Sequence, residues 1–269
     1  MTEFTRLRRT QDGPVARVAL ARPEVRNAFD DVLIDELTRA FSEIGAEARD
    51  RTRVAVLSGD GPSFCAGADI AWMRRAGAYG REENEADALR MARMLRTIDT
   101  CPVPVIALAH GAAIGGGVGL VAAADIAIAA EGTVFSLAEV KLGILPSVIS
   151  PYVLRAIGPR QARDLFLTGD RFDAREAFRI GLVHGVVAAG EALEAAGKRK
   201  IDALLSSAPE AIRIAKALIE EVTGKNPEEA MPLTVRTIAE RRASEEAREG
   251  LSAFLEKRKP SWVKPAGDR

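Results

Sequence analysis

Residues Pro104 to Glu139 read PVIALAHGAAIGGGVGLVAAADIAIAAEGTVFSLAE. A short apolar run is followed by three consecutive glycines, a second uncharged run and then an isolated acid, Glu139. Glycines let a backbone approach a ligand closely and leave its N–H groups uncovered. A helix that begins at this turn adds its dipole, so the segment favours binding of an anion or a developing oxyanion.

Strand and helix patterns alternate on both sides of this segment, which predicts an α/β domain with crossover connections. The Trp72–Glu85 stretch has no clean period, and we expect it to be irregular. Strands are expected at Val15–Leu20, Val54–Ser58, from Val105, at Ile126–Ala129 and at Val183–Val187, and helices from Asp30, at Ala88–Ile98, at Gly116–Ala124 and from Ser150.

From Glu191 onward the pattern is almost wholly helical, with expected breaks near Pro209, Gly224, Pro227 and Gly250. We therefore expect a core at residues 1–190 and a helical C-terminal region at residues 191–269.

Composition excludes several classes of protein. Lys plus Arg and Asp plus Glu both number 38, so no net field favours nucleic acid or an anionic membrane. Cys65 and Cys101 have neither metal nor redox spacing, and the N-terminal segment lacks the apolar core of a secretory signal, so we expect a cytoplasmic protein. Val103 to Ala124 lacks formal charge, but its strand and turn signals predict no membrane span.

Familiar nucleophile, P-loop, dinucleotide and zinc motifs are absent from the sequence, and His110 and His184 are expected to be structural. What remains is Glu139 together with two glycine turns, at Gly67-Ala68 and at Gly115 to Gly117. Two N–H groups aimed at one oxygen stabilise an enolate, and a partly desolvated carboxylate can move protons near neutrality. The alternative is that Glu139 only caps or pairs within the fold.

Several motifs in one order resemble the enoyl-CoA hydratase/isomerase (crotonase) family, over nearly the whole chain. They are Arg22-Pro-x-x-Arg-Asn-Ala28, Phe64-Cys-Ala-Gly-Ala-Asp-Ile70, His110-Gly-x-x-x-Gly-Gly-Gly117, Asp125, Phe135-Ser-Leu-Ala-Glu139, Leu142-Gly-Ile-Leu-Pro146, Leu167-Thr-Gly-Asp170 and Phe254-Leu-Glu-Lys-Arg-Lys-Pro260.

The resemblance implies an α/β fold, a spiral of ββα units whose helical C-terminal region forms a homotrimer or a dimer of trimers. It implies an acyl-CoA thioester as substrate, with coenzyme A part of the substrate and no separate cofactor or metal. The thioester oxygen would be held by the N–H groups of Ala68 and Gly116. Glu139 would transfer the proton. Coenzyme A would lie along the loop that holds Ala66, Asp69 and Ile70, and Lys257 would reach its phosphates from a neighbouring subunit.

One position departs from the family pattern. Typical hydratases carry a second glutamate two residues after the glycines, where this chain has Gly119. Glu139 alone would suffice for hydration if another group positions the water, and Ser147, Ser150 and the acids of residues 82–87 are candidates. A single glutamate equally suits isomerisation of a 3-enoyl to a 2-enoyl thioester.

A finer likeness concerns the substrate. The Gly115–Asp125 and Ser136–Tyr152 stretches look like bacterial methylglutaconyl-CoA hydratase-type members, and a carboxylated acyl chain would need a cation such as Arg74, Arg75 or Arg81. A third hypothesis is a scaffold retained for RNA binding, against which the zero net charge argues.

Overall fold

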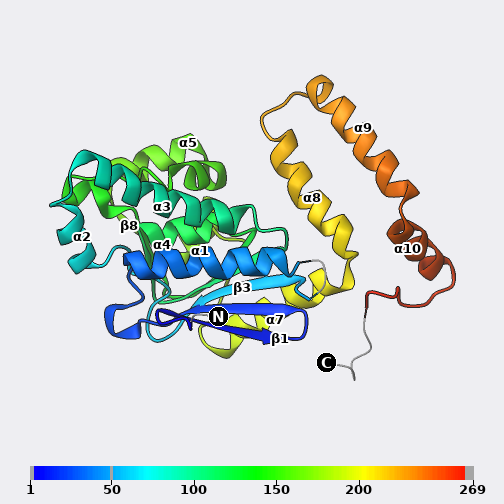
Figure 1. The fold of residues 1–269 in the computed structure, drawn as a ribbon, viewed down its shortest axis with the longest axis horizontal. Helices are drawn as coiled ribbons and strands as arrows, with labels where there is room; N and C mark the ends of the chain where they lie inside the picture. Colours follow the sequence, from blue (N-terminus) through cyan, green and yellow to red (C-terminus); the bar gives the residue numbers. More distant parts are fainter. Residues whose placement is uncertain (1–2, 49–50, 264–269) are drawn as a thin grey trace.

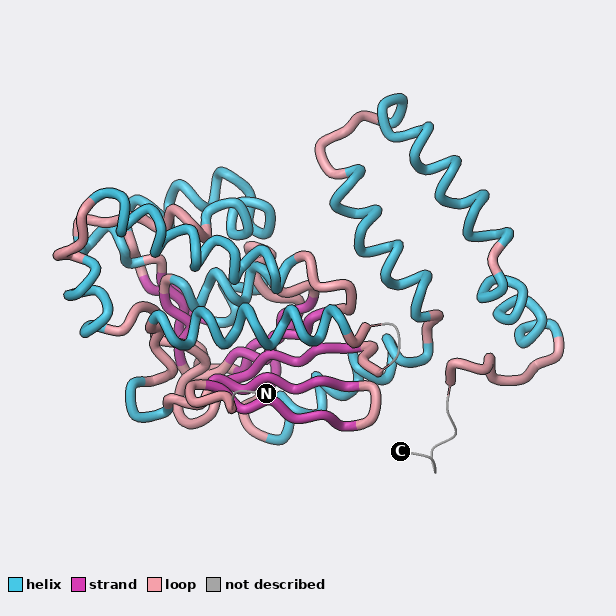
Figure 2. Tube along the Cα trace, in the orientation of Figure 1, coloured by secondary structure: helices cyan, strands magenta, loops and turns pink. Residues whose placement is uncertain are grey.

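The computed structural model describes residues 3–48 and 51–263. Met1 and Thr2 of the N-terminal segment lie outside the described residues. The protein contains two sheets. The larger one has six strands in the order β1-β2-β3-β4-β6-β9, and all neighbouring strands are parallel except β1 and β2, which form a hairpin (Figures 1 and 2). These strands are β1 Leu7–Asp12, β2 Val15–Leu20, β3 Val54–Gly59, β4 Val105–Ala109, β6 Ile126–Ala130 and β9 Gly185–Val187.

The central strands are uncharged because helices cover both faces of the sheet. One face packs on α1 (Asp31–Ala46), whose predicted apolar stripe from Leu33 to Ile44 is buried as expected. The other face packs on α7 (Glu191–Ser206) through Leu193, Ala196 and Ile201. Figure 1 shows α1 and α7 on opposite sides of the strands.

A second sheet has three strands in the order β5-β7-β8, and it carries the glycine turn. Its strands are β5 Ala112–Ile114, β7 Val134–Ser136 and β8 Arg171–Asp173. Helix α4 (Gly116–Ala123) leaves β5 at once, and the 3-10 helix η2 (Ala138–Leu142) follows β7. Because β5 and β7 are parallel neighbours, the glycine turn and Glu139 emerge at the same edge.

Helix boundaries mostly follow local signals. Gly158 and Pro159 interrupt α5 (Ser150–Thr168), and the Asp173 side chain caps α6 (Ala174–Arg179), as the sequence predicts. The other helices are η1 Pro23–Val25, α2 Ile70–Ala76, α3 Arg81–Asp99, α8 Pro209–Val222, α9 Pro227–Ala243 and α10 Glu245–Leu255.

Two expectations are wrong. The Trp72–Glu85 stretch is not irregular, because Asp69 caps α2 and the Glu83 carboxylate accepts the Gly80 N–H at 3.0 Å at the start of α3. Gly250 does not break α10, since it is the place where Trp262 packs against the helix.

The C-terminal helices α8 to α10 extend away from the sheets (Figures 1 and 2). None of the residues in α8 or α9 is buried, and both helices expose apolar side chains. Helix α7, by contrast, belongs to the packed body. The spiral core and helical C-terminal region expected for an α/β protein of this type are therefore both present.

Candidate active site

Glu139 lies in the first turn of η2 and meets the glycine turn directly. The Gly115 N–H donates to the Ser136 carbonyl at 2.8 Å, which ties the turn to the end of β7. A Cβ atom at Gly115 would lie 2.8 Å from the Glu139 Oε1, and the φ of Gly115 is +52°. Both facts require glycine, and they show the carboxylate resting against bare backbone.

The Glu139 carboxylate is partly withdrawn from water. Its Oε2 is buried and has no hydrogen-bond partner among the described residues. Burial raises the pKa of Glu139 above its ordinary value, and its own backbone N–H opposes this shift only in part. A raised pKa makes this carboxylate a better acceptor for a proton from a bound ligand.

The loop that leads to Ala68 lies along β5, next to the glycine turn. The Cys65 N–H donates to Ala112 and the Ile114 N–H donates to Cys65, at 3.0 and 2.9 Å, so the loop that continues to Ala68 runs along β5. A Cβ atom at Gly117 would lie 2.4 Å from the Cys65 carbonyl oxygen, so loop and helix are in close contact. Within the described chain, neither the Ala68 nor the Gly116 N–H has a recorded acceptor. A Cβ atom at Gly67 would lie 3.1 Å from the Ile114 carbonyl oxygen, so the turns that hold Ala68 and Gly116 meet at the end of β5, and Glu139 lies against Gly115 there.

The Ala68 loop is fixed from its other side by a buried cation. Phe29 donates to Gly67 at 2.7 Å and accepts from the Asp69 N–H at 2.8 Å. Arg22, only 7% exposed, donates to the Asp69 Oδ2 at 2.9 Å. Burial alone would raise the pKa of Asp69, but hydrogen bonds from Arg22 and from two N–H groups of α2 lower it. Asp69 is therefore occupied in holding the loop. Arg22 begins one of the quoted motifs, but its role as a positioning residue is not evident from the sequence.

The remaining members of the predicted coenzyme A loop differ in exposure. The Ala66 N–H donates to the Arg26 carbonyl at 2.9 Å, and Ile70 is 72% exposed at the start of α2. Lys257 is exposed and follows α10, and Figure 1 shows α10 at the other end of the molecule from α2. A single chain does not bring Lys257 to Glu139.

The cations proposed for a carboxylated chain have mostly other partners. Arg75 pairs with Asp31 at 2.9 Å, and Arg81 pairs with Glu85 at 2.8 Å. Arg74 is exposed, and no partner is recorded for it among the described residues. Neither Ser147 nor Ser150 has a recorded side-chain hydrogen bond within the described chain, and neither is recorded in contact with Glu139.

The indole N–H of Trp72 is a polar group that sequence reasoning missed. Trp72 is the one buried residue of α2, the helix that follows the Ala68 loop, and it belongs to the main apolar core. Its buried Nε1–H has no acceptor among the described residues. Buried Trp N–H groups usually find a partner, so this donor is unusual.

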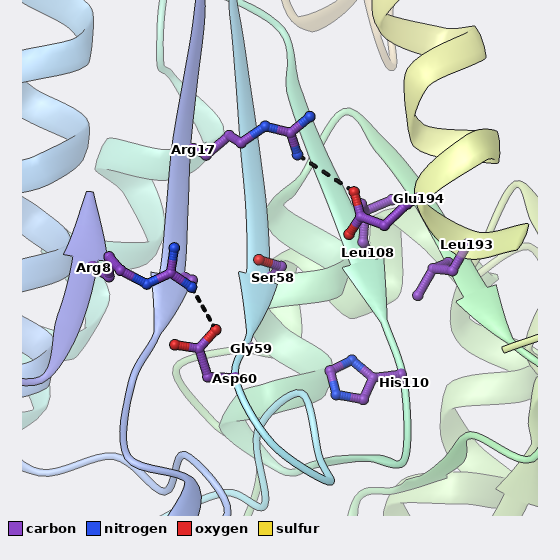
Figure 3. A pocket seen from close by; sticks show the side chains of 10 residues that line it. Arg8, Arg17, Ser58, Gly59, Asp60, Leu108, His110, Leu193 and Glu194 are labelled. Atoms are coloured by element: carbon purple, nitrogen blue, oxygen red, sulfur yellow. Dashed lines mark hydrogen bonds and ion pairs between the residues drawn. The ribbon is translucent and has the colours of Figure 1, made fainter. Parts of the chain in front are cut away.

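A pocket of about 250 Å³ lies on the α7 side of the larger sheet, and it contains none of these groups (Figure 3). Its charges are already paired, Arg8 with Asp60 at 2.7 Å and Arg17 with Glu194 at 3.5 Å. His110 lines it and lies 2.9 Å through Nε2 from the Gly61 carbonyl, which is a structural role. His184 likewise accepts the Ala127 N–H.

Over residues 3–48 and 51–263, no group of three or more His, Cys, Asp or Glu side chains is arranged to hold a metal ion. In that same part of the chain, no helix is both long enough and apolar enough to cross a bilayer.

The chain is similar to known proteins over nearly its whole length. The family model for enoyl-CoA hydratase/isomerase matches residues 10–265. A crotonyl-CoA hydratase of Syntrophomonas wolfei is 35% identical over 93% of this chain and 94% of its own.

Two solved structures superpose closely. The structure of an enoyl-CoA hydratase from Shewanella pealeana has a TM-score of 0.92 and 41% identity, covering 97% of both chains. Pseudomonas aeruginosa AtuE has a TM-score of 0.92 and 37% identity, covering 97% of this chain and all of its own. The chain belongs to the enoyl-CoA hydratase/isomerase family.

Proposed function

We infer that the protein adds water to the double bond of a 2-enoyl-CoA thioester. The single observation that carries this inference is the half-buried Glu139 carboxylate resting against Gly115, next to the Gly116 N–H, which like that of Ala68 has no acceptor among the described residues. The hydratase names of several relatives support the same reaction class.

In the proposed reaction, Ala68 and Gly116 donate to the thioester oxygen. Glu139 removes a proton from water while the water oxygen bonds to C3, and the electron pair of the double bond moves through C2 to the thioester oxygen. The resulting enolate is stabilised by the two N–H groups, each worth about 3 kcal/mol of barrier in comparable sites. Glu139 then returns the proton to C2, so one carboxylate accounts for every atom of the added water.

Coenzyme A is proposed to lie along the Ala66–Ile70 loop. The exposed apolar side chain of Ile70 offers a surface for the adenine ring, whereas Asp69 acts through the loop that it fixes. Lys257 would contact phosphate from a second copy. The exposed apolar side chains of α8 to α10 support such an assembly, as a trimer or a dimer of trimers.

The test is loss of absorbance at the conjugated thioester with crotonyl-CoA. We expect turnover by the wild-type chain and a decrease in kcat of at least about 100-fold for Glu139→Gln. Glu240→Gln, on the exposed end of α9, is the matched control and is expected to retain full activity. Absence of turnover by the wild type would refute the proposal for this substrate.

A second candidate function is isomerisation of a 3-enoyl to a 2-enoyl thioester, and the glycine at position 119 favours it. Glu139 would take a proton from C2 and return it to C4, with no water consumed. Incubation in oxygen-18 water separates the two reactions, since only hydration places solvent oxygen in the product. Failure to convert a 3-enoyl thioester would remove this candidate.

For the acyl chain, we propose a carboxylated substrate such as 3-methylglutaconyl-CoA. The unpaired Nε1–H of Trp72 and the exposed guanidinium of Arg74 support it, because a carboxylate accepts from both kinds of donor. Trp72→Phe keeps an aromatic ring and removes the donor. We expect it to lower kcat/KM for 3-methylglutaconyl-CoA about tenfold and to leave crotonyl-CoA hydration nearly unchanged. Equal effects on both substrates would contradict this assignment.

A further inference from the structure

At Gly119, the position that departs from the family pattern, the space that a side chain would need is occupied by Ile149. A Cβ atom at Gly119 would lie 2.3 Å from the Ile149 Cγ2 and 2.9 Å from the Ile149 Cβ, with Leu95 Cδ2 at 3.7 Å. Ile149 is 2% exposed and sits at the start of α5, where its carbonyl accepts the Val153 N–H at 3.1 Å. It is held by the helix and cannot easily retreat.

The contact lies on α4, the helix whose first turn the Glu139 carboxylate touches from η2. The Gly119 N–H donates to the Gly115 carbonyl at 3.1 Å, so the two glycines are one helical turn apart. The Glu139 carboxylate covers Gly115, and the Ile149 side chain covers Gly119. The carboxylate, from η2, and the isoleucine, from the start of α5, therefore lie against positions one helical turn apart at the beginning of α4.

Backbone conformation does not explain the glycine at position 119. Its φ lies outside the left-handed region, and it sits inside α4, all of whose residues are buried. Alanine is the better helix former at an interior position. The contact with Ile149 is what requires glycine here.

We propose that Ile149 is a specificity-determining residue that takes the place of a second acid, and so makes Glu139 the single proton-transfer group along this face of α4. This inference rests on the proposed function. Its chemical consequence is that no carboxylate at position 119 can take part while Ile149 keeps its side chain.

The packing part is tested by thermal unfolding of four proteins: wild type, Gly119→Ala, Ile149→Ala and the double variant. In the wild-type background, Gly119→Ala is expected to lower Tm by at least about 3 °C because of the clash. In the Ile149→Ala background the same change is expected to raise Tm, since the space is open and alanine favours the helix. The same effect in both backgrounds would overturn the proposal, and no substrate is needed to see it.

The chemical part uses a carboxylate at position 119. Gly119→Glu alone is expected to lose crotonyl-CoA hydration, and Gly119→Glu with Ile149→Ala to regain at least about tenfold over Gly119→Glu. The single variant Ile149→Ala is the control, because it shows how much the loss of the isoleucine side chain alone changes the activity. We also expect the pH profile of kcat/KM of the double variant to show one more ionisation than that of Ile149→Ala, which a packing role would not produce.

Equal activity of Gly119→Glu and the double variant, or pH profiles with the same number of ionisations, would overturn the inference. If the wild type itself fails to hydrate crotonyl-CoA, the proposed function fails for that substrate. The thermal comparison still decides the packing of Ile149 against Gly119 in that case.

Discussion

At the scale of single residues, Gly115 matters both for the backbone conformation and for the position of the Glu139 carboxylate, and Gly132 provides a matched control. Gly115→Ala is expected to destabilise the protein by about 1–2 kcal/mol through its positive φ and to lower kcat about 100-fold by displacing the Glu139 carboxylate. Gly132 has a φ of +80° and open space around its missing side chain. Gly132→Ala should therefore cost similar stability and no activity, as measured by urea unfolding and the hydration assay. Equal loss of activity in both variants would contradict the role given to Gly115.

Glu139 should also stabilise the fold less at neutral pH than at acidic pH. Burial raises its folded-state pKa, so the folded state holds the proton more tightly than the unfolded state. Stability is then lost as pH rises from the unfolded pKa through the raised folded pKa. We expect Glu139→Gln to have a higher Tm than the wild type at pH 8, with the difference shrinking towards pH 4. Glu240→Gln is the control, and a difference that does not depend on pH would contradict the linkage.

Sequence reasoning finds some residues of the site and misses others for a physical reason. Glu139 stands out as an isolated acid in an apolar run, and Gly119 stands out against the family pattern. Ile149 and Trp72 do not, because what covers a glycine or leaves a donor unpaired depends on contacts between distant segments. The catalytic roles of Ala68, Gly116 and Glu139 stay predictions until activity is measured.

At the scale of elements, the Ala68 loop depends on a buried ion pair. Arg22 and Asp69 have side chains only 8% and 14% exposed, and Arg22 also contacts Asp30 at 3.2 Å. Arg22→Leu leaves the Asp69 carboxylate without its cation and Asp30 with Arg6 alone, at 3.3 Å, so we expect a loss of about 3 kcal/mol in the free energy of unfolding and a lower kcat. Arg8 pairs with Asp60 in a more exposed setting, and Arg8→Leu should cost less than about 1 kcal/mol. Similar losses for both arginines in urea unfolding would contradict this account.

The elements that the sequence predicts well are those with strong local signals. The apolar runs of β3, β4 and β6 and the periodic stripe of α1 are all confirmed. Strands β5, β7 and β8 have three residues each, too few for a pattern, and they exist because they pair with one another. Helix α3 begins earlier than predicted because its first turns are charged and show no apolar period.

At the scale of the whole molecule, the helical region beyond α7 is the part that a single chain leaves unexplained. Helices α8 and α9 bury none of their residues, although α8 has a clear apolar side. Local patterns predict these helices but not what they pack against, since the covering surface is not in their own sequence. The division near residue 190 stays a proposal, although α7 lies beyond that residue and packs on the larger sheet. The trimer also stays a proposal.

The assembly can be tested at Phe254 in α10, which is 80% exposed. A trimer has three times the 28.8 kDa of one chain, and a dimer of trimers has twice that mass again. If α10 is covered by a second copy, Phe254→Glu places a charge in an apolar contact, and we expect light scattering to show a smaller assembly. KM for crotonyl-CoA should rise in the same variant, because Lys257 of a neighbouring copy would no longer reach coenzyme A. Phe178→Glu, on the 55% exposed face of α6 in the packed body, is the matched control and is expected to keep both the mass and the KM. An unchanged mass for Phe254→Glu, or an equal loss in both variants, would show that this helix is not the contact that holds the assembly together.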